Sequence, residues 1–208
     1  MQEENRDSVP FQIGHDDFIS PTFKEFLGSH RFDLVVVCDC PEICIEGSLS
    51  KLIHSPLPPN VRIVTQNNLN SREQAKVRQF RIDGYIKTHF WSPPIEREQD
   101  AWSCTDKSSE EKSISWVAFY NDEILLTSDS SLIDGEFWLS WGWHNENLVS
   151  AELLTQVWKH VLRLQLTECK ALGGKLIGEF DSTDRFAQFK RKLLVEKAPD
   201  RWNILQQK

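Results

Sequence analysis

The amino-acid sequence predicts an α/β protein of the α+β kind, in which a mixed, largely antiparallel sheet is flanked by helices. Three observations indicate this fold class. Three strand-like segments separated by tight turns fill residues 114–143, and an amphipathic helix follows over residues 150–172. The chain has 208 residues and is 39% hydrophobic, enough to bury the core of one domain with an appendage.

The first 59 residues predict a strand-and-helix extension in front of the main domain. Residues 1–20 are polar and acidic and predict a loose arm, and a short helix is expected over residues 23–27. Residues 32–38 form an apolar run rich in β-branched side chains, which is typical of a buried strand inside a parallel sheet. A second short helix is expected over residues 47–54, before a group of prolines.

The main domain is expected to span residues 60–208. Residues 60–65 alternate between apolar and polar side chains, which predicts a strand. A helix that Ser71 can cap follows to about His89, with apolar residues at partial helical spacing. Residues 95–113 are charged and serine-rich without periodicity, and they predict a mobile loop.

The centre of the domain predicts an antiparallel meander. Residues 114–120 and 123–128 are expected to pair, because the Asn-Asp sequence at 121–122 favours a tight turn. Asp-Gly at 134–135 favours a second turn, and residues 136–143 then form a third strand.

The long helix begins at Ser150, a residue that caps helices well, and ends before two glycines at 173–174. Its apolar residues recur every three or four positions, as one buried helix face requires. The remaining elements are a strand over 175–180, a helix that Asp181 or Ser182 caps and that runs to Leu194, and a short strand over 202–205.

Charge and composition argue against several classes of function. The formal net charge is −7, and the one short basic run, at residues 190–192, is expected to be a solvated helix end, so no nucleic-acid partner is expected. No apolar run is long enough to span a membrane, and the acidic N-terminus does not resemble a signal peptide, so a cytoplasmic protein is expected. The motifs of dinucleotide enzymes, P-loop NTPases, zinc proteases and serine hydrolases do not occur.

The order of elements from residue 60 onward resembles the GNAT superfamily of acyl-CoA-dependent acyltransferases. The resemblance covers about residues 60–205 and includes the local sequence Ala-Leu-Gly-Gly-Lys-Leu-Ile at 171–177. It implies a sheet in which the third meander strand and the next strand part, so that the pantetheine arm of an acyl-CoA lies between them. It also implies that the cofactor pyrophosphate binds backbone amides at the start of the long helix.

The resemblance places cofactor binding at the turn over residues 141–149, and the residues expected to bind the cofactor are Gly142, Asn145, Glu146, Asn147 and Leu148. Acetyl-CoA or another acyl-CoA is the expected cofactor. The family usually builds this turn from an Arg and two glycines, whereas here there is one glycine, no Arg and an acidic Glu146. The tyrosine that the family often carries on its last helix has no match, because that helix offers Phe186 and Phe189.

Two residues are candidates for the base that deprotonates an amine. Glu179 follows the strand after the long helix, and His144 follows the tryptophan-rich strand and titrates near neutral pH. The alternatives are that Glu179 is a solvated residue at the edge of the sheet and that His144 is a surface histidine. Tyr85, Trp141 and Trp143 are expected to line a substrate pocket, since alternation puts both tryptophans on one strand face, with core packing as the alternative.

Five cysteines without framework spacing predict free thiols. Cys38, Cys40 and Cys44 lie close together in the sequence, but structural zinc needs four ligands, and neither His54 nor Cys104 stands at a recognised spacing. Buried thiols are therefore the preferred interpretation, and no metal is expected.

The resulting hypothesis is a divergent acyl-CoA-dependent N-acyltransferase that acts on a small-molecule or protein amine. The alternative is a GNAT-like protein without catalysis, which binds a protein partner through residues 1–59 or 95–113. The missing Arg, glycine and tyrosine favour this alternative, and the shape of the cleft beside residues 139–149 distinguishes the two.

Overall fold

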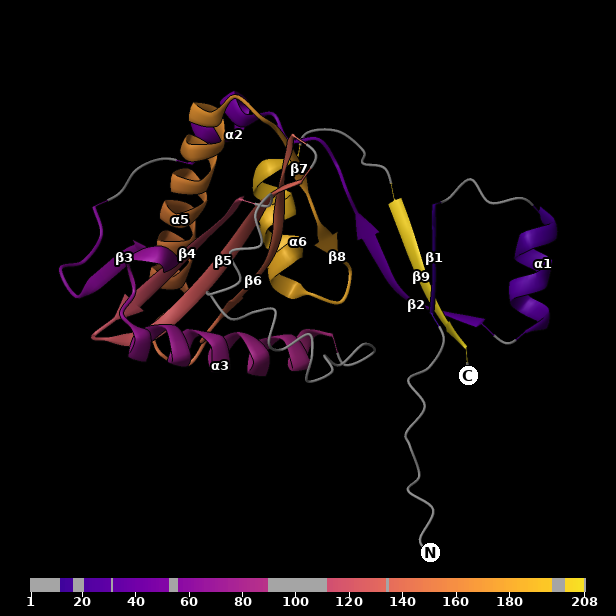
Figure 1. The fold of residues 1–208 in the computed structure, drawn as a ribbon, viewed down its shortest axis with the longest axis horizontal. Coiled ribbons are helices and arrows are strands. Elements are labelled where there is room, and N and C mark those ends of the chain that lie inside the picture. Colours follow the sequence, from indigo (N-terminus) through magenta and orange to yellow (C-terminus); the bar gives the residue numbers. More distant parts are fainter. Residues whose placement is uncertain are drawn as a thin grey trace, which may run out of the picture.

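The computed structural model describes most of the chain and shows two sheets, one in a main body and one in an arm that projects from it (Figure 1). The arm carries helix α1 at its far end (Figure 1). The described residues are 12–16, 21–30, 32–52, 56–89, 112–133, 135–195 and 201–207. Most of the mobile loop predicted over residues 95–113 lies outside them.

The main body contains a five-stranded sheet in the order β3-β4-β5-β6-β7. Neighbouring strands are antiparallel except for β6 and β7, which are parallel, so the predicted mixed, largely antiparallel sheet is confirmed. The strands are β3 (Val61–Thr65), β4 (Lys112–Tyr120), β5 (Glu123–Ile133), β6 (Glu136–His144) and β7 (Lys175–Gly178).

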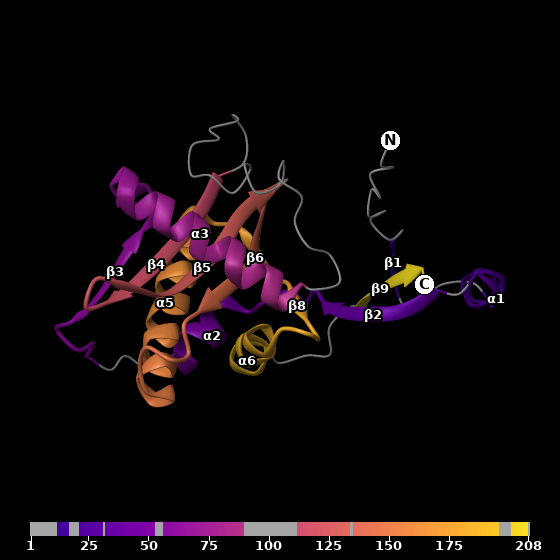
Figure 2. The ribbon, with the colours of Figure 1, turned by 90° about the horizontal axis from the view of Figure 1, so that it is seen from below.

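Two long helices cover opposite faces of this sheet (Figures 1 and 2). On α5 (Ala151–Leu172), Val157, Trp158 and Val161 pack with Ala118 of β4. On the other face, Val77 of α3 (Ser71–Thr88) packs with Val117 and Phe119. Successive β4 side chains therefore pack into the hydrophobic cores on opposite faces of the sheet, as the two-residue period of a strand requires.

The ends of these helices follow from local sequence. The side chain of Ser150 accepts a hydrogen bond from the backbone N–H of Leu153, and Gly173 ends α5 in the left-handed region at φ 71°. Asn70, rather than Ser71, caps α3, in a reciprocal capping box with Glu73. The predicted spans of both helices are confirmed, with this shift of one cap residue.

The arm contains the second sheet, in the order β1-β9-β2-β8, with every pair antiparallel. Two predictions are wrong here. Residues 12–16, expected to be part of a loose arm, form a strand, and residues 32–38 lie in an antiparallel sheet instead of a parallel one. The strands are β1 (Gln12–Asp16), β2 (Phe32–Asp39), β8 (Phe180–Asp181) and β9 (Arg201–Gln207).

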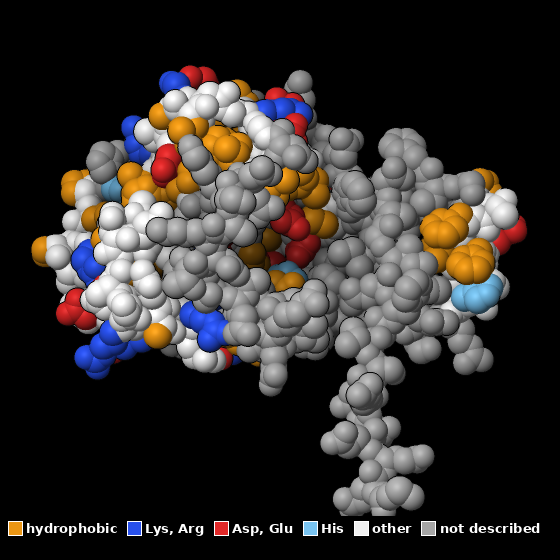
Figure 3. Space-filling model, viewed as in Figure 1, with side chains coloured by type: hydrophobic (Ala, Val, Ile, Leu, Met, Phe, Trp, Pro, Cys, Tyr) orange, Lys and Arg blue, Asp and Glu red, His pale blue; other side chains and the backbone are white. Residues whose placement is uncertain are grey.

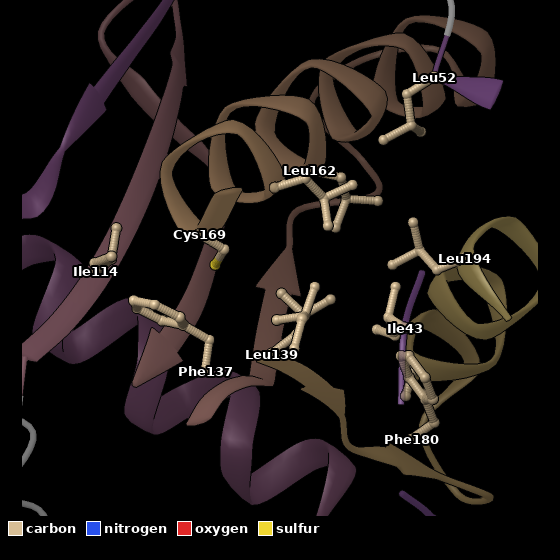
Figure 4. Close-up of a cluster of buried hydrophobic side chains, with 12 residues drawn as sticks. Ile43, Leu52, Ile114, Phe137, Leu139, Leu162, Cys169, Phe180 and Leu194 are labelled. Atoms are coloured by element: carbon tan, nitrogen blue, oxygen red, sulfur yellow. The ribbon is translucent and has the colours of Figure 1, made fainter. Parts of the chain in front are cut away.

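The remaining described elements are three shorter α-helices, α1 (Pro21–Ser29), α2 (Ile45–Lys51) and α6 (Arg185–Leu194), and one 3₁₀ turn, η1 (Gln66–Asn68). The ends of α2 and α6 converge on α5 around a cluster that includes Leu52, Leu162 and Leu194, together with Phe137 and Leu139 of β6 (Figure 4). This cluster fixes α6 beside β6. None of the described helices is long and apolar enough to cross a membrane.

Candidate functional site

Strands β6 and β7 separate half-way along β6. They pair from Glu136 to Leu139, opposite Lys175 to Gly178, and a last hydrogen bond of 3.2 Å joins the N–H of Glu179 to the carbonyl of Leu139. The chain then turns away, and β8 pairs with β2 instead. The expected strand over residues 175–180 is therefore interrupted at Glu179. Only glycine fits at position 178 beside this turn, because the Cβ of any other residue would lie 2.4 Å from the ring of Phe180 and would clash with it.

A bulge in β6 lies where the strands separate. Ser130 of β5 pairs with Leu139 and Ser128 with Gly142, so two β6 residues stand opposite Asp129 alone. The side chain of Asp129 is held by an ion pair with the buried Arg81 of α3. Bulges turn side chains to new directions, and here the second of the two bulge residues, Trp141, contacts Thr88 of α3.

The carbonyl oxygen of Ser140 is bound by a side chain instead of a strand. The Nζ of Lys190 on α6 donates a hydrogen bond to it at 2.7 Å, and Lys190 has no solvent exposure. Burial lowers the pKa of this ammonium group, while the charges of Asp184 and Glu179 act in the opposite direction. The prediction that residues 190–192 form a solvated helix end is thus wrong at Lys190, because this residue lies on the face of α6 that buries Phe186 and Leu194.

A hydrogen-bonded network surrounds His89, at the end of α3. Its Nε2 lies 3.1 Å from Oδ2 of Asp181, its Nδ1 lies 2.8 Å from Oγ1 of Thr88, and the Nε1 of Trp141 donates to the same hydroxyl at 3.2 Å. The ring of Tyr85 is stacked on the imidazole, with centroids 3.8 Å apart. An ionised Asp181 accepts only, so the Nε2 of His89 donates to it, while the Thr88 hydroxyl also lies 3.2 Å from the carbonyl of Gly84 and 3.3 Å from that of Tyr85.

This assignment makes His89 a group that orients Asp181 rather than one that receives a proton from a substrate. Asp181 was expected to cap the last helix, but Asp184 caps α6, with its Oδ1 accepting from the N–H of Phe186 at 2.7 Å. The carboxylate of Asp181 instead faces His89 at the end of α3, while its backbone carbonyl accepts a hydrogen bond from the Gln188 side chain of α6 at 3.0 Å.

Glu179 lies within range of the charges of Asp181, His89 and Lys190. The pKa of Glu179 is raised, first by burial of its carboxyl group and then by the charge of Asp181, while Lys190 and His89 lower it. The residue is nevertheless exposed. A side chain in a recess has both properties, because water reaches it while protein replaces much of the surrounding solvent. Figure 3 shows acidic side chains in such a recess of the main body, next to a histidine.

A pocket of about 480 Å³ opens beside the end of β6. It is lined by the end of β6, the turn after it, the start of α6 and the last turns of α3. The walls are aromatic at Phe80, Trp143 and Phe186, and Lys87 and Arg185 bring positive charge. The ring of Trp143 lies against Gly84, where a Cβ would come within 2.2 Å of it.

His144 lies in the pocket wall among aromatic rings. Its ring centroid is 5.8 Å from Trp143, 6.1 Å from Trp158 and 5.2 Å from Phe186. Burial lowers the pKa of His144, although Glu146 and Asp184 act against this. Its Nδ1 is buried and makes no hydrogen bond to the described part of the chain. The environment therefore favours the neutral imidazole.

The turn before α5 uses several of its own amides. The N–H of Asn145 donates to the carbonyl of Leu125, that of Leu148 to the carbonyl of Asn145, and that of Asn147 to the Asn145 side chain. Ser150 binds a further N–H at the helix end. Of the amides at 146–150 expected to be open to an anion, those of Asn147 and Leu148 thus have intramolecular partners.

The structure divides the predicted site residues into two groups. Trp143, His144, Asn145, Glu146 and Asn147 line the pocket. Tyr85, Trp141 and Glu179 belong to the recess around His89, and Tyr85 meets Trp141 edge-to-face at 5.7 Å. The other two lie elsewhere: Gly142 packs against Trp158, and Leu148 packs against the α5 core.

Sequence reasoning missed His89, Thr88, Asp181 as a network residue, and Lys190. One signal was present for Lys190, which stands four residues from both Phe186 and Leu194 on the apolar side of α6. No pattern in the sequence indicates the contact between His89 and Asp181, which are 92 residues apart. Among the described residues, no group of three or more His, Cys, Asp or Glu side chains is arranged to hold a metal ion.

With this geometry, the chain has the fold of the GNAT superfamily of GCN5-related N-acetyltransferases. A GCN5-related N-acetyltransferase from Kribbella flavida matches with a TM-score of 0.59 at 12% identity, over 95% of this chain and 68% of that chain. A tandem GNAT protein from the clavulanic acid biosynthesis pathway, solved without AcCoA, matches with a TM-score of 0.60 at 10% identity, over 94% of this chain and 62% of that chain.

A functionally unknown conserved protein from Staphylococcus epidermidis matches equally well, with a TM-score of 0.58 at 12% identity, over 95% of this chain and 73% of that chain. The likeness therefore extends beyond residues 60–205, into the first 59 residues for which the sequence suggested no counterpart. At these identities it concerns the fold, and this chain spans about two thirds of the length of these neighbours. No protein-family model and no curated protein sequence matches the chain.

Proposed function

We propose that the chain is a divergent acyl-CoA-dependent N-acyltransferase that transfers an acyl group to an amine. The observation that carries the proposal is the separation of β6 and β7 after Leu139, beside a pocket lined by the end of β6 and beside the exposed Glu179. The general acyltransferase-type fold supports it.

The pocket fits the head of a coenzyme A in its chemistry. Lys87 and Arg185 suit phosphate groups, and the ring of Trp143 suits an adenine ring. Three acidic residues, Asp83, Glu146 and Asp184, also line the pocket, and the carboxylate of Asp184 caps α6. When bound, an acyl-CoA supplies an acyl group activated as a thioester.

The chain's own part in the reaction is to remove a proton from the acceptor amine. Glu179 suits this role, because its raised pKa makes its carboxylate a stronger base than an ordinary glutamate. Asp181 adds negative charge beside it and is held in place by His89. A protonated amine is attracted to this acidic recess before it gives up its proton. His144, whose pKa is lowered by burial, lies in the pocket wall.

One observation favours the alternative of a GNAT-like protein that binds a partner without catalysis. The Lys190 ammonium holds the Ser140 carbonyl, which faces the gap where β7 has turned away, and two amides of the following turn are already bound. A cofactor arm lying along β6 would have to displace Lys190. The acyltransferase proposal therefore requires this hydrogen bond to open when the cofactor binds.

Calorimetric titration of the purified chain with CoA and acetyl-CoA tests the proposal. Binding is expected, and Arg185→Gln, which removes a pocket cation, should weaken it, whereas Lys192→Gln on the exposed side of α6 should not. Glu179→Gln should bind the cofactor normally and lose acyl transfer to a panel of amines. No heat and no thermal shift at millimolar CoA would contradict the proposal and favour the non-catalytic alternative.

A further inference from the structure

The chain crosses between the two sheets at Cys40. Before this residue, Cys38 and Asp39 of β2 pair with Asp181 and Phe180 of β8. After it, the carbonyl of Pro41 accepts a hydrogen bond from the N–H of Gly178 at 2.9 Å, and the N–H of Ile43 donates to the carbonyl of Leu176 at 2.8 Å. The joint at Cys40 thus lies opposite Glu179, where the partner strand is interrupted as well.

Two thiols meet at this joint. The Sγ of Cys38 lies 3.7 Å from the Sγ of Cys40, and both are reduced. A disulfide bond is about 2.05 Å long, so a small rotation of the side chains is enough to close the gap. Cys38 is buried and Cys40 is partly exposed, so an oxidant in solution reaches Cys40 first.

The other described cysteines are placed differently. The Sγ of Cys44 accepts a hydrogen bond from the N–H of Gly47 and so caps α2. Cys169 lies on α5 and is buried in the core. The short contact therefore singles out Cys38 and Cys40 among the cysteines that the structure describes.

We propose that Cys38 and Cys40 form an oxidisable dithiol site, which a peroxide converts to an intrachain disulfide. The Cys40 thiolate attacks one peroxide oxygen, the O–O bond breaks, and Cys40 becomes a sulfenic acid as the first water leaves. The Cys38 sulfur then displaces the hydroxyl group from Cys40. The S–S bond forms, the S–O bond breaks, and the Cys38 proton leaves with the second water. Two thiols are oxidised and one peroxide is reduced to two waters.

The surroundings set the order of these steps. The hydrogen bond with Cys40, burial and the charge of Asp181 all raise the pKa of the Cys38 thiol, which disfavours Cys38 as the thiolate that attacks the peroxide. Asp39, between the two cysteines, forms an ion pair of 2.6 Å with Arg191 of α6. Asp181, opposite Cys38, holds His89. The disulfide therefore forms at the backbone that positions both acidic groups.

Mass spectrometry of the full chain tests the proposal. The reduced protein is treated with hydrogen peroxide, its remaining thiols are alkylated, and it is digested with trypsin, which yields residues 32–51 as one peptide with all three nearby cysteines. In Cys44→Ser, this peptide should lose the mass of two hydrogens, take no alkylating group, and regain both thiols on treatment with dithiothreitol.

Two further variants separate the roles of the thiols. Cys38→Ser should form no bridge, and Cys40 should instead proceed to sulfinic and sulfonic acids. Cys40→Ser should leave Cys38 reduced. The proposal is wrong if the Cys44→Ser peptide keeps two alkylatable thiols, or if Cys40 over-oxidises while Cys38 stays reduced. Far-UV circular dichroism confirms that each variant is folded before oxidation.

Discussion

The Nζ of Lys190 and the carbonyl oxygen of Ser140 form a hydrogen bond of 2.7 Å at the point where β6 no longer has β7 beside it. A fully buried ammonium group thus satisfies a backbone acceptor that a strand would otherwise satisfy. The same lysine lies near Glu179, whose pKa it lowers. The contact therefore links the backbone of β6 to the acidic recess.

Replacing Lys190 with methionine keeps most of the side-chain volume and removes the donor. The orphaned Ser140 carbonyl should lower the free energy of unfolding by about 1–3 kcal/mol, with relief of the buried charge offsetting part of the loss. Urea unfolding measures this change. Lys192→Met, on the exposed side of the same helix, is the control and should stay within about 0.5 kcal/mol of the unmodified chain. Equal stability of the two variants would show that the hydrogen bond contributes nothing.

Gly84→Ala should destabilise the protein although alanine favours helices. The new methyl group would meet the ring of Trp143 at 2.2 Å, and such overpacking costs about 1–3 kcal/mol, more than the gain in helix propensity of about 1 kcal/mol. The variant should also shift the tryptophan fluorescence, because Trp143 must move within the pocket wall.

Gly28→Ala on α1 is the matched control, because a Cβ at Gly28 meets nothing within 4 Å. It should stabilise the chain by roughly 0.5–1 kcal/mol, the usual gain in a helix. If both substitutions raised the urea midpoint, Trp143 would not be packed against Gly84.

His144→Gln should reduce the acid sensitivity of the fold. The folded-state pKa of His144 is lowered below its ordinary value of 6.5, so between the two values the unfolded chain binds more protons. Stability is therefore present above pH 6.5 and declines as the pH falls through this window. Urea midpoints at neutral and mildly acidic pH should differ more for the unmodified chain than for the variant. Identical pH dependence would place His144 in solvent.

Glu179→Gln should leave the fold at least as stable at neutral pH. The pKa of Glu179 is raised, so ionisation of this carboxyl group opposes folding once the pH exceeds the unfolded value near 4.5. The variant lacks this charge, and its advantage should vanish in acid, where glutamate is protonated in both states. Denaturation over a range of pH checks this. A lower stability of the variant at neutral pH would show that the carboxylate is held by favourable contacts.

Local patterns in the sequence predicted most of the main body. Asn121 and Asp122 adopt positive φ values of 48° and 63°, as a tight turn between two strands requires, and the strands on both sides are present. Ser150 and Gly173 mark the ends of α5 as expected. These signals succeed because turns and helix caps depend on neighbours within a few residues.

The arm and the recess depend on contacts that are distant in the sequence. The partner of β2 is β9, more than 150 residues later, and no local pattern in residues 32–38 specifies whether that partner is parallel or antiparallel. The position of Asp181 likewise depends on β8 leaving β7 to join β2. Local reasoning placed the helix cap at Asp181 or Ser182, because such residues before a helix are typical caps. Asp184, which follows closely and fits the same pattern, is the residue that caps α6.

The position of β9 between β1 and β2 determines the order in which the protein can be built during translation. β1 and β2 do not pair with each other, and each needs β9 as its neighbour. The five strands of the main body have all been synthesised once Gly178 is in place, whereas the arm waits for residues 201–207. A nascent chain from which Gly178 has left the ribosome, but residues 201–207 have not, would carry a formed body and two strands without their β9 neighbour, a substrate suited to chaperones.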